Sequence, residues 1–198
     1  MTLELWNTFA TFGTFVVIAA TAIAALVQLR HARGSNQIAA LTQLAEAQET
    51  QQFDVADHFI RSDLAAKLQD PEFRYQIANR AARTAENITL MRQVSTVGNY
   101  WENVGLLVRT GLVDRDLAMN IYADTAAVTW NELAPYAAIS RERSGPGVWE
   151  NFEYFVVLCQ DWLAAHPEGA FPAGVRRIPV KNEWQEADKQ YAASRASA

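Results

Sequence analysis

An uncharged apolar run near the start of the chain is the strongest pattern in the sequence. It extends from Leu5 to Leu29 and is bounded by Glu4 and Arg30. A helix rises about 1.5 Å per residue, so a helix of this length exceeds the roughly 30 Å hydrocarbon core of a bilayer. The run lacks the preceding basic residues of a signal peptide and the Lys- and Arg-rich face of an interfacial helix. We therefore predict an uncleaved membrane span.

Basic side chains near this run occur only on its C-terminal side. Arg30, His31 and Arg33 follow the run, and no basic residue precedes it. The positive-inside rule then places the C-terminal side in the cytoplasm, which predicts a single-pass protein of the inner cell membrane. Small residues recur at four-residue spacing between Ala19 and Ala25, and such spacing permits close helix pairing in lipid. Tolerance of alanine in a span explains them as well, and both interpretations stay open.

The segment directly after the span is rich in good helix formers. Gly34-Ser35-Asn36 is a natural break or N-cap, and Gln37 to Gln52 consists largely of Ala, Gln, Leu and Glu. Its apolar stripe is short, about one heptad and a half, whereas a coiled coil needs three or four heptads. We interpret residues 34–52 as a helical stalk and leave open whether it is continuous with the span.

Apolar residues then recur at helical spacing through residues 53–168. Asp70-Pro71 ends one helix and caps the next, because Asp is a favoured N-cap and Pro is tolerated in a first turn. The best helix is predicted at about Glu86 to Thr110, and its wide apolar arc indicates a central position. A further helix begins at Asp114, and Pro135 should kink or end it. The last bundle helix is predicted from Val148 to Ala165.

These patterns predict an all-α protein, because no stretch alternates with the period of a β-strand. The predicted organisation is a membrane span with flanks at 1–33, a helical stalk at 34–52, a helical bundle at 53–168 and an extended or disordered tail at 169–198. Within the bundle we expect Trp101, Trp130, Phe152 and Val156 to be buried together.

Composition and motifs favour no particular chemistry. The net charge of −5 argues against binding nucleic acid, which proteins usually meet with a basic face. Cys159 is the only cysteine, which excludes a disulfide framework, and it lies on an apolar stripe. His31, His58 and His166 stand outside Glu-x-x-His or His-x-x-x-His spacing. No phosphate-binding glycine loop or nucleophile elbow is present. We predict no catalytic residue, no metal and no cofactor.

One cluster of polar residues is a candidate for a ligand-binding or catalytic site. Asn99, Glu102 and Arg109 share a narrow strip of the predicted central helix, and Arg141 and Glu153 come from other helices. A carboxylate in a helical cleft could bind a cation or act as a base, which gives a candidate ligand-binding set of Asn99, Glu102 and Arg141. In the alternative, Glu102 and Arg141 form a partly buried ion pair that fixes two helices. We favour the pair.

The same region resembles a bacterial family of unknown function whose members join one N-terminal span to a small helical domain. The resemblance covers roughly residues 85–165. It is carried by Asn99-Tyr100-Trp101-Glu102, Gly111-Leu112-Val113, Trp130 with Leu133-Ala134-Pro135 and Arg141, and Trp149-Glu150-Asn151-Phe152-Glu153. It implies the fold and the membrane location, and it supplies no activity and no catalytic residue.

We therefore expect a membrane-anchored cytoplasmic interaction or regulatory module without catalytic activity. Its expected partners are the lipid bilayer and another protein, with no nucleic acid, and self-association through span and stalk is an open alternative. A second alternative is an enzyme or small-ligand receptor that uses a polar cleft around Glu102 and Arg141.

Overall fold

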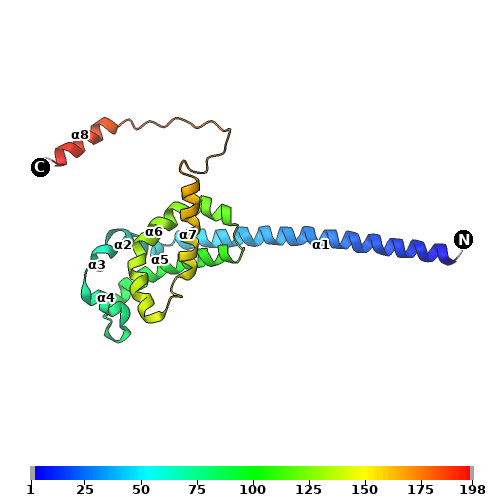
Figure 1. The fold of residues 1–198 in the computed structure, drawn as a ribbon, viewed down its shortest axis with the longest axis horizontal. Coiled ribbons are helices and arrows are strands. Elements are labelled where there is room, and N and C mark those ends of the chain that lie inside the picture. Colours follow the sequence, from blue (N-terminus) through cyan, green and yellow to red (C-terminus); the bar gives the residue numbers. More distant parts are fainter. Residues whose placement is uncertain (1–2, 197–198) are drawn as a thin grey trace. The chain divides into compact units, whose positions relative to one another are not determined.

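Helix α5 (Ala85–Arg109) is the element around which the bundle packs (Figure 1). The computed structural model describes the backbone of residues 3–196 and the side chains of residue 6 and residues 11–195. In it, α5 contacts α2 (Gln51–Ser62), α6 (Arg115–Ser144) and α7 (Glu150–Ala165). The expected stripe on α5 is buried, namely Met91, Val94, Val97, Trp101, Val104 and Val108. The central position predicted for this helix is confirmed.

Short helices complete one side of the bundle. They are α3 (Leu64–Lys67), α4 (Pro71–Ala78) and the 3-10 helix η1 (Arg80–Ala82), and α4 packs against α6. Asp70 accepts a hydrogen bond from Glu72 N, and Asp114 accepts one from Leu117 N, so both residues are N-caps as expected. No strand occurs among residues 3–196, and the all-α prediction is confirmed.

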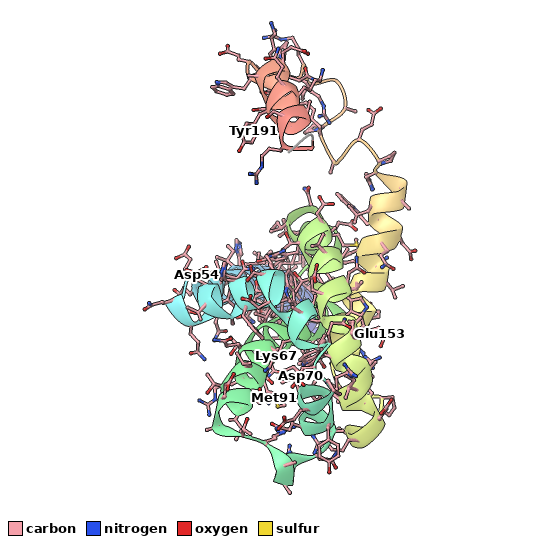
Figure 2. All side chains as sticks on the ribbon, turned by 90° about the vertical axis from the view of Figure 1, so that its left-hand side faces the viewer. Asp54, Lys67, Asp70, Met91, Glu153 and Tyr191 are labelled. Carbon is pink, nitrogen blue, oxygen red and sulfur yellow. The ribbon has the colours of Figure 1, made fainter. Side chains whose placement is uncertain are left out.

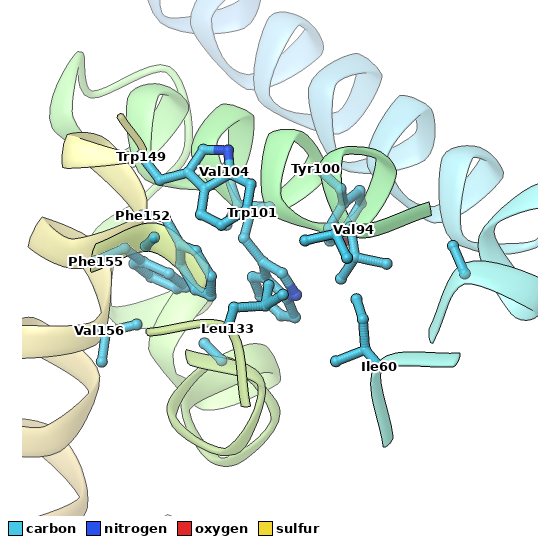
Figure 3. Packing of buried hydrophobic residues seen from close by; sticks show 14 of the residues in the cluster. Ile60, Val94, Tyr100, Trp101, Val104, Leu133, Trp149, Phe152, Phe155 and Val156 are labelled. Carbon is cyan, nitrogen blue, oxygen red and sulfur yellow. The ribbon is translucent and has the colours of Figure 1, made fainter. Parts of the chain in front are cut away.

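An aromatic cluster between α5 and α7 lies within the core (Figure 3). Trp101 is 1% exposed, and its ring stacks on Phe152 and Phe155 at centroid distances of 5.7 and 6.4 Å. Val156 is buried beside them, whereas Trp130 is half-buried with its ring 5.0 Å from that of Phe152. Trp101, Phe152 and Val156 are therefore buried in the core as expected, whereas Trp130 lies at the edge of the core and is only half-buried.

Span and stalk form one helix, α1 (Leu3–Gln48), which passes through Gly34–Asn36 without a break. A glycine in an exposed helix costs only about 1 kcal/mol relative to alanine. Favourable residues on both sides and the packing of buried Leu44 on the bundle outweigh that cost. The structure answers the question of continuity that the sequence left open.

The last turns of α1 run antiparallel to α5. Arg33 lines a surface cleft together with Gly111, just beyond the end of α5. Ala47 lines another cleft together with Thr96, near the middle of α5. The end of α5 therefore lies beside the start of the segment 34–52, which was predicted as the stalk. The beginning of α5 lies on the side away from the span.

Two other elements differ from expectation. Helix α6 continues past Pro135 to Ser144, because Leu133, Tyr136 and Ala137 on either side of the proline are buried in the core. Residues 168–198 form a second unit, which has no helix before residue 185 and forms an unexpected helix, α8, at Gln185–Ala196. The expected ends of the flanks and tail at residues 1–2 and 197–198 lie outside the described residues.

Candidate functional site

The polar residues singled out in the sequence all meet at the junction of α6 and α7, namely the intervening loop and the first turn of α7. Gly145 ends α6 with φ 85°, and Trp149 stands directly before α7 with φ 54°. That left-handed conformation costs a residue with a side chain on the order of 1–3 kcal/mol. Trp149 also provides no side-chain cap for α7. The start of α7 therefore depends on contacts from other helices.

Two glycines allow α7 and its loop to lie directly on α5. A side chain at Gly98 would overlap the indole of Trp149, and one at Gly105 would overlap the backbone carbonyl of Asn151. Trp149 is also stacked on Tyr136, with ring centroids 5.9 Å apart. This packing holds Trp149 in its unfavourable backbone conformation. Glycine in the middle of a helix is a cost in propensity, and here close packing accounts for both residues.

Glu102 caps α7 from the neighbouring helix. Its Oε2 accepts hydrogen bonds from the backbone N–H of Asn151 at 3.0 Å and of Phe152 at 2.9 Å. Its Oε1 accepts a third from Asn151 Nδ2 at 2.7 Å. The first N–H groups of a helix lack partners inside the helix, and a carboxylate there also meets the positive end of the helix dipole. Glu102 thus supplies the side-chain cap for the start of α7 that the N-cap residue Trp149 does not supply.

Arg141 fixes the same loop from α6. Its Nε and Nη2 donate to the carbonyl of Val148 at 3.0 and 2.9 Å, and Nη2 pairs with Glu153 at 2.7 Å. Its guanidinium also lies 5.6 Å from the ring centroid of Trp130. Glu153 is an exposed residue of α7, labelled in Figure 2.

The expected ion pair between Glu102 and Arg141 is wrong. Within residues 3–196 no such pair is formed, because each side chain is committed to a different part of the loop. Glu102 binds the free N–H groups at the start of α7, and Arg141 binds the carbonyl that precedes it. Both therefore fix the helices, as the favoured interpretation required, but through the backbone of a third segment.

The remaining members of the cluster also serve this junction. Asn99 Oδ1 accepts from Trp149 Nε1 at 3.1 Å. Arg109 donates to Asn151 Oδ1 at 3.0 Å, and it lies 3.5 Å from Glu150 in an exposed ion pair. The candidate residues Asn99, Glu102 and Arg141 are thus brought to one loop, but they do not converge on one cavity. The sequence analysis overlooked Gly98 and Gly105, whose seven-residue spacing within a strong helix was the available signal.

A cleft with a strongly basic lining lies beside this junction. It has a volume of about 420 Å³ and is bounded by η1, the first half of α5 and the end of α6. Asn99 and Trp149 contribute to its wall, and four arginines line it: Arg80, Arg83, Arg92 and Arg143. Burial raises the pKa of Tyr136, another lining residue, while the nearby charges of Arg83 and Arg143 oppose that rise.

The cysteine of the chain is buried, and the described residues hold no cluster of metal ligands. Burial raises the pKa of the Cys159 thiol to about 12, so the thiol is protonated at neutral pH and is a poor nucleophile. The described residues contain no group of three His, Cys, Asp or Glu side chains that could hold a metal ion.

Fold and junction define an all-helical bundle joined without a break to a long apolar N-terminal helix. The chain belongs to the family described as domain of unknown function DUF4760, whose model matches residues 15–162. The match begins inside the apolar run and ends in α7, so it takes in the whole bundle and leaves α8 outside. Searches of the curated proteins and of the solved structures found no match.

Proposed function

We propose that the chain is a membrane-anchored interaction or regulatory module of a bacterial cell. In this proposal the apolar part of α1 crosses the inner membrane once, and the bundle lies in the cytoplasm, where it contacts a protein partner. The matched family carries no known activity, so the proposal rests on the physical properties of the helices.

The apolar surface of α1 is the observation that carries the proposal. Its most apolar window has no buried residue, although the bundle has a closed core of its own. Phe12, Phe15 and Ile23 are 66%, 68% and 63% exposed. An apolar surface of this extent is stable in lipid or in an interface but not in water. The family match starts at residue 15, within this run, which supports the run as a retained part of the domain over a removable leader.

The orientation is supported by the charges that flank the apolar run. Arg30 and Arg33 are exposed on α1 immediately after it, and no basic residue precedes it. The positive-inside rule then favours a cytoplasmic bundle.

A role in binding is supported by how the polar side chains are used. Glu102 and Arg141 hold the start of α7, which favours a structural role over the alternative of an enzyme or receptor built around these two residues. The apolar face of the stalk is covered only in part, since Leu44 is buried within the chain whereas Ile38 is 67% exposed. Self-association through span and stalk therefore stays an open alternative.

Reporter fusions test this topology. Alkaline phosphatase or green fluorescent protein is fused after Ala198 of the full chain and expressed in a bacterial host. We expect fluorescence without phosphatase activity, in a membrane fraction that resists extraction with alkaline carbonate. Phosphatase activity without fluorescence would refute the orientation, and release by carbonate would refute the span. A fusion with the span reversed by moving Arg30 and Arg33 before the run provides the control, because the rule predicts the opposite readout.

A further inference from the structure

We propose that the basic cleft bounded by η1, α5 and α6 binds a soluble small molecule that carries phosphate groups. In the sequence, Arg80, Arg83 and Arg92 form a locally basic stretch that suits a solvated surface, and Arg143 lies far from it. The fold brings them around one cleft together with polar donors and an aromatic wall.

The charge of the cleft is unbalanced. No acidic residue lines it, although the whole chain is acidic with a net charge of −5. Among the described residues, the guanidinium groups of Arg80, Arg92 and Arg143 make no ion pair and no hydrogen bond. By contrast, Arg61, Arg109 and Arg141 each pair with a carboxylate. Three unpaired cations around one concave surface raise the local concentration of anions.

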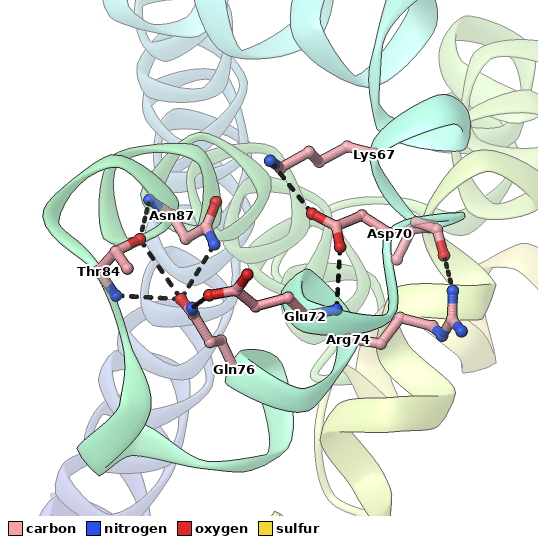
Figure 4. Close-up of polar contacts among 8 residues, drawn as sticks. Lys67, Asp70, Glu72, Arg74, Gln76, Thr84 and Asn87 are labelled. Carbon is pink, nitrogen blue, oxygen red and sulfur yellow. Dashed lines mark hydrogen bonds and ion pairs between the residues drawn. The ribbon is translucent and has the colours of Figure 1, made fainter.

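The turn between α4 and α5, which carries Arg80 and Arg83, is held by hydrogen bonds of Gln76 to Thr84 and Asn87 (Figure 4). Gln76 is 2% exposed, and its Oε1 accepts hydrogen bonds from Thr84 N and Asn87 Nδ2, both at 3.0 Å. Arg83 donates back to the carbonyls of Gln76 and Ile77, each at 2.9 Å. These bonds close the turn that contains η1, so Arg80 is presented from a fixed loop. A preformed site loses less conformational entropy on binding a ligand.

The residue types fit phosphate better than other anions. Arginine offers a planar set of N–H donors that matches phosphate oxygens in pairs. The cleft adds Ser144 and Asn99, and the amide N–H groups of Asn99 stay available because its oxygen accepts from Trp149. A volume of about 420 Å³ suits a small molecule rather than a macromolecular segment. Several phosphate groups, as in a pyrophosphate or a nucleoside triphosphate, would engage more than one arginine.

The choice of a soluble phosphate over a lipid headgroup rests on the proposed function, because it needs α1 to span the bilayer. Arg33 at the membrane end of the bundle lies beside Gly111, whereas Arg92 lies about 27 Å back along α5 at 1.5 Å per residue. Since α1 and α5 are antiparallel, that distance leads away from the span. Phosphate groups of the bilayer surface are therefore out of reach of the cleft.

Calorimetry on the full chain in detergent micelles tests the site. The probe is pyrophosphate at an ionic strength of about 0.15 M, which screens weak surface charge. The test variant Arg92→Gln/Arg143→Gln removes two exposed arginines that hold no other part of the fold. The control Arg115→Gln/Arg195→Gln removes the same charge from exposed helix positions outside the cleft. A parallel arm repeats the calorimetry with short-chain phosphatidic acid in the same micelles, because the apolar helix would bind any vesicle.

We expect saturable binding of pyrophosphate that weakens at least about tenfold in the test variant and stays unchanged in the control. The proposal is overturned if pyrophosphate at about 1 mM gives no binding, or if both double variants weaken it equally. Binding of phosphatidic acid without binding of pyrophosphate would also overturn it and would point to a headgroup site. Because calorimetry uses micelles, its result is independent of the reporter fusions that test the topology.

Discussion

Replacing Glu102 by alanine should destabilise the bundle, because it removes all three hydrogen bonds that this side chain accepts at the start of α7. Two of the donors are the backbone N–H groups of Asn151 and Phe152, which lose their partner at a half-buried position. An unsatisfied buried donor costs about 1–3 kcal/mol, and the loss of a charge at a helix N-terminus adds about 0.3–1 kcal/mol. Water can take over part of the lost hydrogen bonding, so we expect the free energy of unfolding to fall by about 2–4 kcal/mol in total.

The isosteric substitution separates charge from shape. Glu102→Gln keeps one oxygen that can accept from the backbone, but it turns an NH2 group toward other donors and removes the charge. We expect it to cost about half as much as Glu102→Ala, roughly 1–2 kcal/mol. Glu46→Ala is the matched control, because Glu46 is exposed on α1 and caps no helix.

Thermal unfolding of the full chain in a mild detergent, followed by circular dichroism, measures these effects. For a chain of this size 1 kcal/mol shifts Tm by about 2–4 °C, so Glu102→Ala should lower Tm by roughly 5–15 °C. Native-state hydrogen exchange should show faster exchange at the amides of Asn151 and Phe152. A shift below about 2 °C, equal to that of Glu46→Ala, would refute the capping role and would revive a chemical role for Glu102.

Three further predictions concern the core. Trp101→Ala should cost about 3–5 kcal/mol in the same assay, since Trp101 is 1% exposed, and a cost below about 1 kcal/mol would contradict its central position. Gly105→Ala should cost about 1–3 kcal/mol, because the new methyl group overlaps the Asn151 carbonyl, whereas Gly34→Ala at an open helix position should be neutral or stabilising by up to about 1 kcal/mol. Cys159, whose pKa is raised to about 12, should resist alkylation by iodoacetamide at pH 8 until the chain is unfolded, and rapid alkylation of the native chain would show that it is accessible.

Local signals were sufficient for most of the helices. Asp70 with Pro71, and Asp114, are capping residues whose preference is set by their own side chains. The stripe on α5 was readable because burial on a helix follows its period. Such features depend on a few neighbouring residues and survive any arrangement of the rest of the chain.

Features that depend on tertiary contacts were not predictable in the same way. Pro135 is tolerated because packing on either side outweighs its local cost, and Gly34 because helix-favouring residues flank it and Leu44 packs on the bundle. Glu102 bonds to the first turn of α7 and Arg141 to the loop before it, and the path of this junction is set by Trp149 and two glycines on α5. Helical spacing indicates only which side chains can lie near one another. It therefore identified Glu102 and Arg141 as helix-fixing residues, but it predicted a pair between them in place of their backbone partners. The basic cleft was likewise dispersed over three elements.

Labelling of single cysteines in intact cells tests the membrane topology most directly. Thr2→Cys and Asp188→Cys are made separately in the natural chain, where buried Cys159 gives the unreactive background. A maleimide that does not cross the inner membrane is added before or after permeabilisation. A single span with a cytoplasmic bundle predicts that Thr2→Cys is labelled in intact cells and that Asp188→Cys is labelled only after permeabilisation. Labelling of Asp188→Cys in intact cells would contradict it.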